Sequence, residues 1–164
     1  MSFPTAINKS LAFGVPGEFY AEGPSRVRSA MIQSADAKNN VFGRAFSQVS
    51  DHVGAGGSEE LFVGILVNPK SQPMYGDSTN PLSPSMTLPN GLNAEFCSMG
   101  ILVVSFTSAV AVGQKVVFDT TTGELSTVAP TATSAGTGKA FVPNCRVTHF
   151  TTAGAGPAVI TLTN

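Results

Sequence analysis

The clearest structural signal in the chain is the stretch GQKVVFDTTTGEL, residues 113–125, which predicts a β-hairpin. Two short segments suited to strands flank a polar turn that ends at Gly123. The Asp119 carboxylate can accept hydrogen bonds from backbone amides that follow it in the turn. Gly123 can adopt the left-handed conformation that the return strand requires. We therefore expect this hairpin to be structural and to carry no chemistry.

Apolar runs bounded by Gly, Asn or Pro occur on both sides of this hairpin. The run LFVGILV at 61–67 stops at an Asn-Pro pair, and ILVVSF at 101–106 is a second run of the same kind. Runs of this length between turn signals are typical of core strands. Further strands are expected at 27–32, 41–49, 116–118, 125–128, 140–150 and 158–162. Short strands at this spacing predict a mainly β fold, a small barrel or a sandwich.

Helix signals are weak throughout the chain. Residues 34–40 suit a turn or a short helix, and no long segment keeps a helical period. The uncharged stretch between Glu95 and Lys115 is long enough to raise the question of a membrane helix. Its serines, glycines and β-branched residues favour two strands around a bend. Asp51 and His52, which lie beside several glycines, are expected in a loop.

The length of 164 residues suits one domain with an extended arm. We expect an arm at 1–24 and a single β domain at 25–164, with a Pro-rich loop at 68–93. Five prolines in this loop prevent regular strand pairing, so it either projects onto a partner or folds back over its own core. The arm must likewise pack on its own barrel or on another chain. The start of the chain shows no signal peptide.

The composition argues against nucleic-acid and membrane partners. Charged residues make up 12% and the formal net charge is −1, whereas nucleic-acid binding calls for a basic face. Five basic residues fall within the first 44 positions: Lys9, Arg26, Arg28, Lys38 and Arg44. They are either ordinary solvated charges or contacts to an acidic protein surface. A surface rich in Ser, Thr and Asn suits a protein that packs against neighbours.

Catalytic, metal and cofactor motifs are not expected. Cys97 and Cys145 lack the spacing of a zinc site and are interpreted as buried small hydrophobic residues. His52 and His149 are not accompanied by the Gly-x-Ser-x-Gly elbow of a hydrolase. The sequence Gly-Thr-Gly-Lys at 136–139 lacks the upstream Gly and the following Ser or Thr of a phosphate-binding loop. We therefore predict no catalytic residue, no metal ligand and no cofactor.

Several segments together resemble the structural cement proteins of tailed phages. The segments are Gly14-Val15-Pro16-Gly17-Glu18, Gly23-Pro24, Phe42-Gly43-Arg44-Ala45, Gly100 with Val103-Val104, residues 113–125, Val142-Pro143-Asn144-Cys145-Arg146 and the ending Gly-Pro-Ala-Val-Ile-Thr-Leu. The resemblance implies a mostly β head on the outer capsid surface of the virion, bound to the major capsid protein. It also implies homotrimers at threefold and local threefold axes, with arms that reach neighbouring subunits.

The predicted function is therefore that of a capsid cement protein that stabilises the assembled phage head. The alternative is a head-fibre or tail module that binds a receptor or glycan, although the absence of Trp and the presence of only two Tyr argue against it. A small hydrolase that uses His52 and His149 is a third hypothesis. Candidate capsid or intersubunit contacts, chosen from the arm, the basic residues and the Pro-rich loop, are Phe13, Val15, Arg26, Arg28, Met74, Tyr75, Leu82 and Met86.

Overall fold

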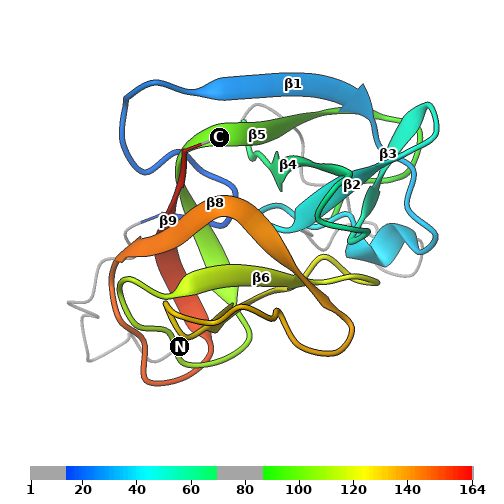
Figure 1. Cartoon of the computed structure of the whole chain (residues 1–164). Helices are drawn as coiled ribbons and strands as arrows, with labels where there is room; N and C mark the ends of the chain where they lie inside the picture. The colour runs from blue at the N-terminus through cyan, green and yellow to red at the C-terminus, as the bar shows by residue number, and fades with distance from the viewer. Residues whose placement is uncertain (1–13, 70–86, 164) are drawn as a thin grey trace, which may run out of the picture.

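The computed structural model describes residues 14–69 and 87–163, and strands dominate this part of the chain (Figure 1). Its elements, in chain order, are β1 (Arg26–Met31), the 3-10 helix η1 (Ala37–Asn39), β2 (Ala45–Val49), β3 (His52–Ala55), β4 (Phe62–Leu66), β5 (Asn93–Phe106), β6 (Lys115–Asp119), β7 (Leu125–Val128), β8 (Lys139–His149) and β9 (Gly156–Thr163). The mainly β prediction is confirmed. Within the described residues, no helix is long and apolar enough to cross a membrane.

Five strands close into a small barrel, in the order β5, β7, β6, β8, β9 and back to β5. The β5–β7 contact is parallel and consists of the pair Phe106 and Leu125, while the other four contacts are antiparallel. A cluster of buried side chains, among them Leu102, Phe118 and Ile160, fills the interior. Closure leaves these strands without a free edge where they pair. Of the two predicted architectures, the barrel is the one that forms.

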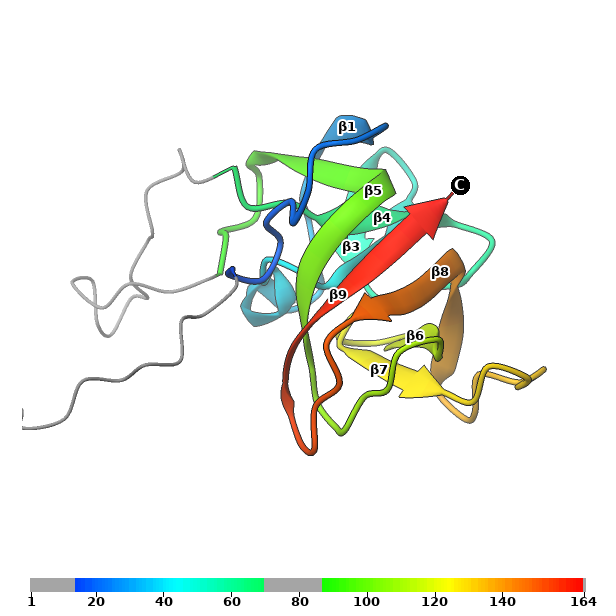
Figure 2. The same cartoon turned by 90° about the vertical axis from the view of Figure 1, so that its left-hand side faces the viewer.

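The remaining strands build an outer sheet on the first half of β5 (Figures 1 and 2). Strand β1 pairs antiparallel with β5, and so does β4, which continues the sheet to β2 and β3. This sheet has a second buried cluster around Phe46, Phe96 and Leu66. Phe46 and Phe96 pack with their ring centroids 5.2 Å apart. Strand β5 is therefore shared between the barrel and the outer sheet.

Strand β5 bends sharply where it passes from the outer sheet into the barrel (Figure 2). Gly100 lies at this passage with φ +148°, a value that side-chain-bearing residues rarely adopt. A Cβ atom there would approach the Phe19 ring to 3.1 Å and the Cys97 sulfur to 3.2 Å. The prediction of two strands between residues 95 and 115 is wrong, because glycine allows one continuous strand to take the bend.

The hairpin predicted at 113–125 is confirmed, and its turn has the expected hydrogen bonds. The Asp119 carboxylate accepts from the Thr121 and Thr122 amides, both at 2.8 Å, and Gly123 has φ +71°. Partial burial raises the pKa of the Asp119 carboxyl. The hydrogen bonds and the nearby Lys139 lower this pKa by more than burial raises it, so the pKa lies below its usual value. The turn also contacts the outer sheet, because the Ala45 amide donates to the Gly123 carbonyl at 2.9 Å.

Three other local predictions have mixed outcomes. Residues 37–39 form the short helix, with the Asp36 side chain accepting from the Lys38 amide. The strand expected at 41–49 begins only at Ala45, since the preceding residues turn. The loop expected at Asp51 and His52 is wrong from His52 onward, because residues 52–55 pair with β2 as strand β3. Glycine there is compatible with a strand, since Gly54 lies close to the Gln33 backbone.

The described end of the N-terminal arm lies on the barrel. Gly17 donates to Val103 at 2.8 Å, Tyr20 donates to Ile101 at 2.9 Å, and Val103 donates to Glu18 at 2.8 Å. Residues 17–20 thus pair with their own β5. Most of the predicted Pro-rich loop and the first 13 residues lie outside the described residues. The division into an arm at 1–24 and a domain at 25–164 stays a prediction.

Replacing Gly123 by alanine tests the contact between the turn and the outer sheet. A Cβ at this position would overlap the Ala45 carbonyl oxygen, and the left-handed backbone costs alanine about 1–2 kcal/mol in addition. Gly138→Ala is a matched control, because Gly138 has φ +70° and nothing within 4 Å of the added atom. We expect Gly123→Ala to lower Tm further than Gly138→Ala, by about 2–4 °C for each extra kcal/mol. Equal Tm values would contradict the contact.

The two cysteines provide a test of the core. Both are free and buried, and burial raises the pKa of Cys97 to about 11 and also raises that of Cys145. At pH 8 both thiols should be protonated and inaccessible, so a chromogenic thiol reagent should label neither in the native protein. Unfolding in urea should release both for reaction. Rapid labelling of either thiol without denaturant would show that this part of the core is open.

Candidate interaction surface

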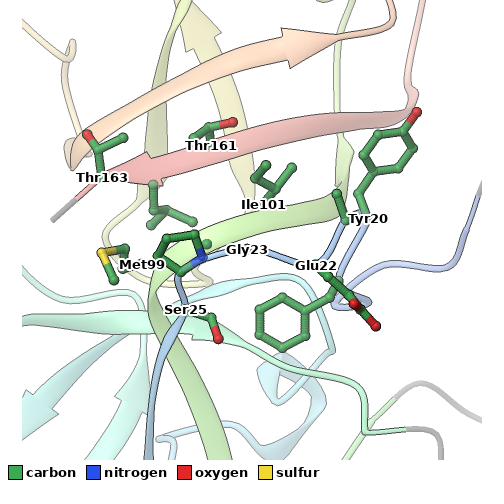
Figure 3. Close-up of a pocket in the computed structure, with 13 residues that line it drawn as sticks. Tyr20, Glu22, Gly23, Ser25, Met99, Ile101, Thr161 and Thr163 are labelled. Atoms are coloured by element: carbon green, nitrogen blue, oxygen red, sulfur yellow. The ribbon is translucent and has the colours of Figure 1, made fainter.

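A groove of about 740 Å³ lies where the N-terminal segment crosses the barrel (Figure 3). The segment leaves β5 after Tyr20 and returns at Arg26, which pairs with Met99. The groove between them has Met99 and Ile101 of β5 on its floor, with Thr161 and Thr163 of β9 beside them. Tyr20 and Thr163 lie at opposite ends in this view. The site combines an apolar floor with a few hydroxyl groups.

An exposed aromatic cluster adjoins the Tyr20 end of the groove. The Tyr20 ring centroid lies 5.4 Å from that of His149 and 5.9 Å from that of Phe150, and the Phe150 ring is nearly perpendicular to it. Phe150 has φ +66°, a backbone conformation that a bulky residue rarely adopts. Tyr20 and Phe150 both remain exposed. Exposed aromatic side chains are enriched at protein interfaces, so this cluster is a candidate contact.

Strand β1 forms a second exposed region on the outer sheet. Five of its six residues are exposed, including the apolar Val27 and Met31, each 40% exposed. Its two charged residues are Arg26 and Arg28, and the Arg28 guanidinium donates to the Gln48 side chain on β2. Ion pairs in the described part of the chain are Arg44 with Glu124 and His52 with Asp51, so neither β1 arginine has a carboxylate partner there.

The residues predicted as contacts do not form one cluster. Arg26 and Arg28 lie on β1, as just described. Val15 is exposed at a separate groove of about 350 Å³, between residues 41–44 and 105–107. The other five lie outside the described residues: Phe13, Met74, Tyr75, Leu82 and Met86. The groove and the aromatic cluster were not predicted, because Tyr20 and Phe150 become neighbours only through the tertiary fold.

The two histidines of the described residues have short contacts with residues next to them in the chain. His52 lies 3.0 Å from Asp51, and this hydrogen bond lowers the pKa of the exposed Asp51 carboxyl. His149 contacts the Thr148 hydroxyl at 3.2 Å. Neither histidine shows the hydrogen bond from a serine or cysteine nucleophile that a catalytic pair would need. Within the ranges 14–69 and 87–163, no group of three or more His, Cys, Asp or Glu side chains could hold a metal ion.

Comparisons with known proteins agree with the fold and identify the family. No curated protein matches the chain. One similar solved structure, titled "The capsid of Myoviridae Phage XM1", has a TM-score of 0.64 at 16% identity, covering 100% of this chain and 99% of that chain. At this identity the likeness establishes a shared fold. The family model described as "Structural cement protein (E217 gp24/Pam3 gp6)" matches residues 3–163. The chain therefore belongs to the phage structural cement protein family.

Proposed function

We propose that this protein binds the outer surface of the assembled phage head, contacts the major capsid protein and stabilises the shell without enzymatic activity. The observation that carries the proposal is the family match, which extends over nearly the whole chain, from residue 3 to 163. Membership of this family makes the protein a structural component of the phage capsid. Its position on the outer surface of the head and its direct contact with the major capsid protein are what we propose beyond this.

The physical properties of the described residues support this role. A closed barrel and an outer sheet, each with its own buried cluster, give a stiff body, while the exposed groove, the aromatic cluster and β1 offer several separate contacts. Several weak contacts on adjacent capsid subunits become one strong attachment because each raises the effective concentration of the next. A ligand that binds the assembled shell and not the free subunits stabilises the shell by mass action.

A homotrimer is the proposed arrangement on the head. Exposed apolar side chains such as Val49, Val112 and Phe150 would gain from burial between copies. Closed cyclic symmetry would bring the same surfaces of three copies to three neighbouring capsid subunits. The head-fibre or tail alternative lacks comparable support, since the family match points to cement proteins.

Heads with and without the protein provide the main test of function. Heads that lack the protein should release DNA at a lower temperature than complete heads. Adding back the purified protein should restore the release temperature of complete heads. At a free concentration of the protein 100 times the Kd, binding stabilises the shell by about 2.7 kcal/mol per site. A DNA-release curve followed with a fluorescent dye can detect this stabilisation. The protein added after heat denaturation serves as the control. Identical release curves with and without the native protein would contradict the proposal.

The assembly state is tested by chemical cross-linking on purified heads. We expect a ladder of bands that ends at three times the 16.8 kDa chain, because a trimer has no fourth neighbour in the same ring. Cross-linking at a tenfold lower reagent concentration controls for contacts between separate oligomers. A ladder that stops at the dimer would contradict the trimer while leaving the cement role intact.

A further inference from the structure

The outer edge of β1 is open over most of its length in the part of the protein that the structure describes. Strand β1 pairs with β5 along its length, and on the other side the next residue, Ile32, makes a single parallel bridge to Val53 of β3. Figure 1 shows β1 at the rim of the outer sheet. A strand at a sheet edge presents unpaired backbone N–H and C=O groups, which can pair with another extended chain. Natural proteins usually shield such edges, so an edge whose residues 26–29 are all exposed calls for a partner.

The hydrogen bonds next to β1 show which backbone groups point outward. The Ile32 amide donates to Leu92 at 2.8 Å, on the side of β5, whereas the Gln33 amide donates to Val53 of β3 at 2.8 Å, on the opposite side. Backbone groups alternate between the two edges of a strand. Those of Ser29 and Val27 therefore point the same way as Gln33, on the part of the edge that the Ile32–Val53 bridge leaves open. An added strand at these residues would lie in line with β3.

The side chains of β1 indicate the chemistry of the added strand. Val27, Ser29 and Met31 lie on one face, while Arg28 lies on the other face, where it contacts Gln48. On the first face, β5 contributes Glu95 opposite Ser29, so an acidic side chain would be disfavoured there and an apolar one would cover Val27 and Met31. On the second face, a carboxylate would complement Arg28. Strand β1 of a second copy carries no acidic residue, so charge favours a different partner.

We propose that an extended segment of the capsid subunit, with acidic and apolar residues in alternation, adds to β1 as a further strand. This inference rests on the proposed cement function and specifies where and how the head is contacted. Main-chain hydrogen bonds would supply affinity, and the alternating side chains would supply specificity. Arg26, at the start of the strand, adds a second positive charge for the same segment.

Ser29→Pro tests the strand addition, because proline removes the outward N–H of Ser29 and leaves the inward hydrogen bonds of β1 in place. Ser29→Ala keeps the N–H and is the matched control. In co-sedimentation with heads that lack the protein, we expect Ser29→Pro to bind roughly tenfold more weakly and Ser29→Ala to bind as the wild type does. Tm of the free variants shows whether the proline variant is folded.

A charge-reversal variant tests the chemistry independently of folding at Ser29. Arg26→Glu combined with Arg28→Glu should weaken binding roughly tenfold, whereas Lys38→Glu, an exposed reversal on η1, should leave it unchanged. Hydrogen exchange should slow at residues 26–31 when the wild type is bound to heads.

If the wild type binds but the β1 variants bind equally well, the inference is overturned and the cement function stands. If the wild type does not bind, both fail. If Ser29→Pro disrupts only self-association, the occupant is a second copy and the inference is overturned.

Discussion

Strand β5 has to serve two sheets at once, and the rest of the architecture depends on the bend that allows this. Its first half pairs with β1 and β4, and its second half closes the barrel against β9. Met99, next to the bend, pairs with both Arg26 and Thr163. Without the positive φ of Gly100, and the close approach of Phe19 and Cys97 that its missing side chain allows, the two buried clusters could not share one strand. The barrel and the outer sheet thus form one mechanical unit.

A second link between the two sheets comes from the β6–β7 turn. The Arg44 guanidinium, at the start of β2, lies 2.6 Å from the Glu124 carboxylate and also donates to the Thr122 carbonyl at 3.2 Å. From the loop that follows β3, the Gly57 amide donates to the Thr120 carbonyl at 2.8 Å. A partly buried arginine with several acceptors holds its geometry better than an isolated surface ion pair. The two links oppose a hinge between the barrel and the outer sheet, so a load applied at β1 would be carried by the whole body.

The sequence predicted features that depend on neighbouring residues and failed where distant segments meet. The hairpin at 113–125 could be predicted because Asp119 and Gly123 satisfy the turn by themselves. Strand β3 could not, because Gly54 and the two glycines that follow the strand look like a loop until the Gln33 backbone is placed beside Gly54. The course of β5 through Gly100 depends on contacts with Phe19, which is far away in the sequence. The same reason explains why the groove and the aromatic cluster were missed, whereas the exposure of Arg26 and Arg28 followed from their charge. Their role as contacts stays a prediction.

The closed barrel also bears on how many copies of this protein can be crowded together. Edge-to-edge growth of β-sheets is the usual route to fibrils, and it requires an open ladder at both sides of each molecule. Closure removes that ladder from five strands, and the arginines of β1 repel an identical edge at the rim. The architecture of the described residues therefore disfavours edge-to-edge growth when many copies are held close together.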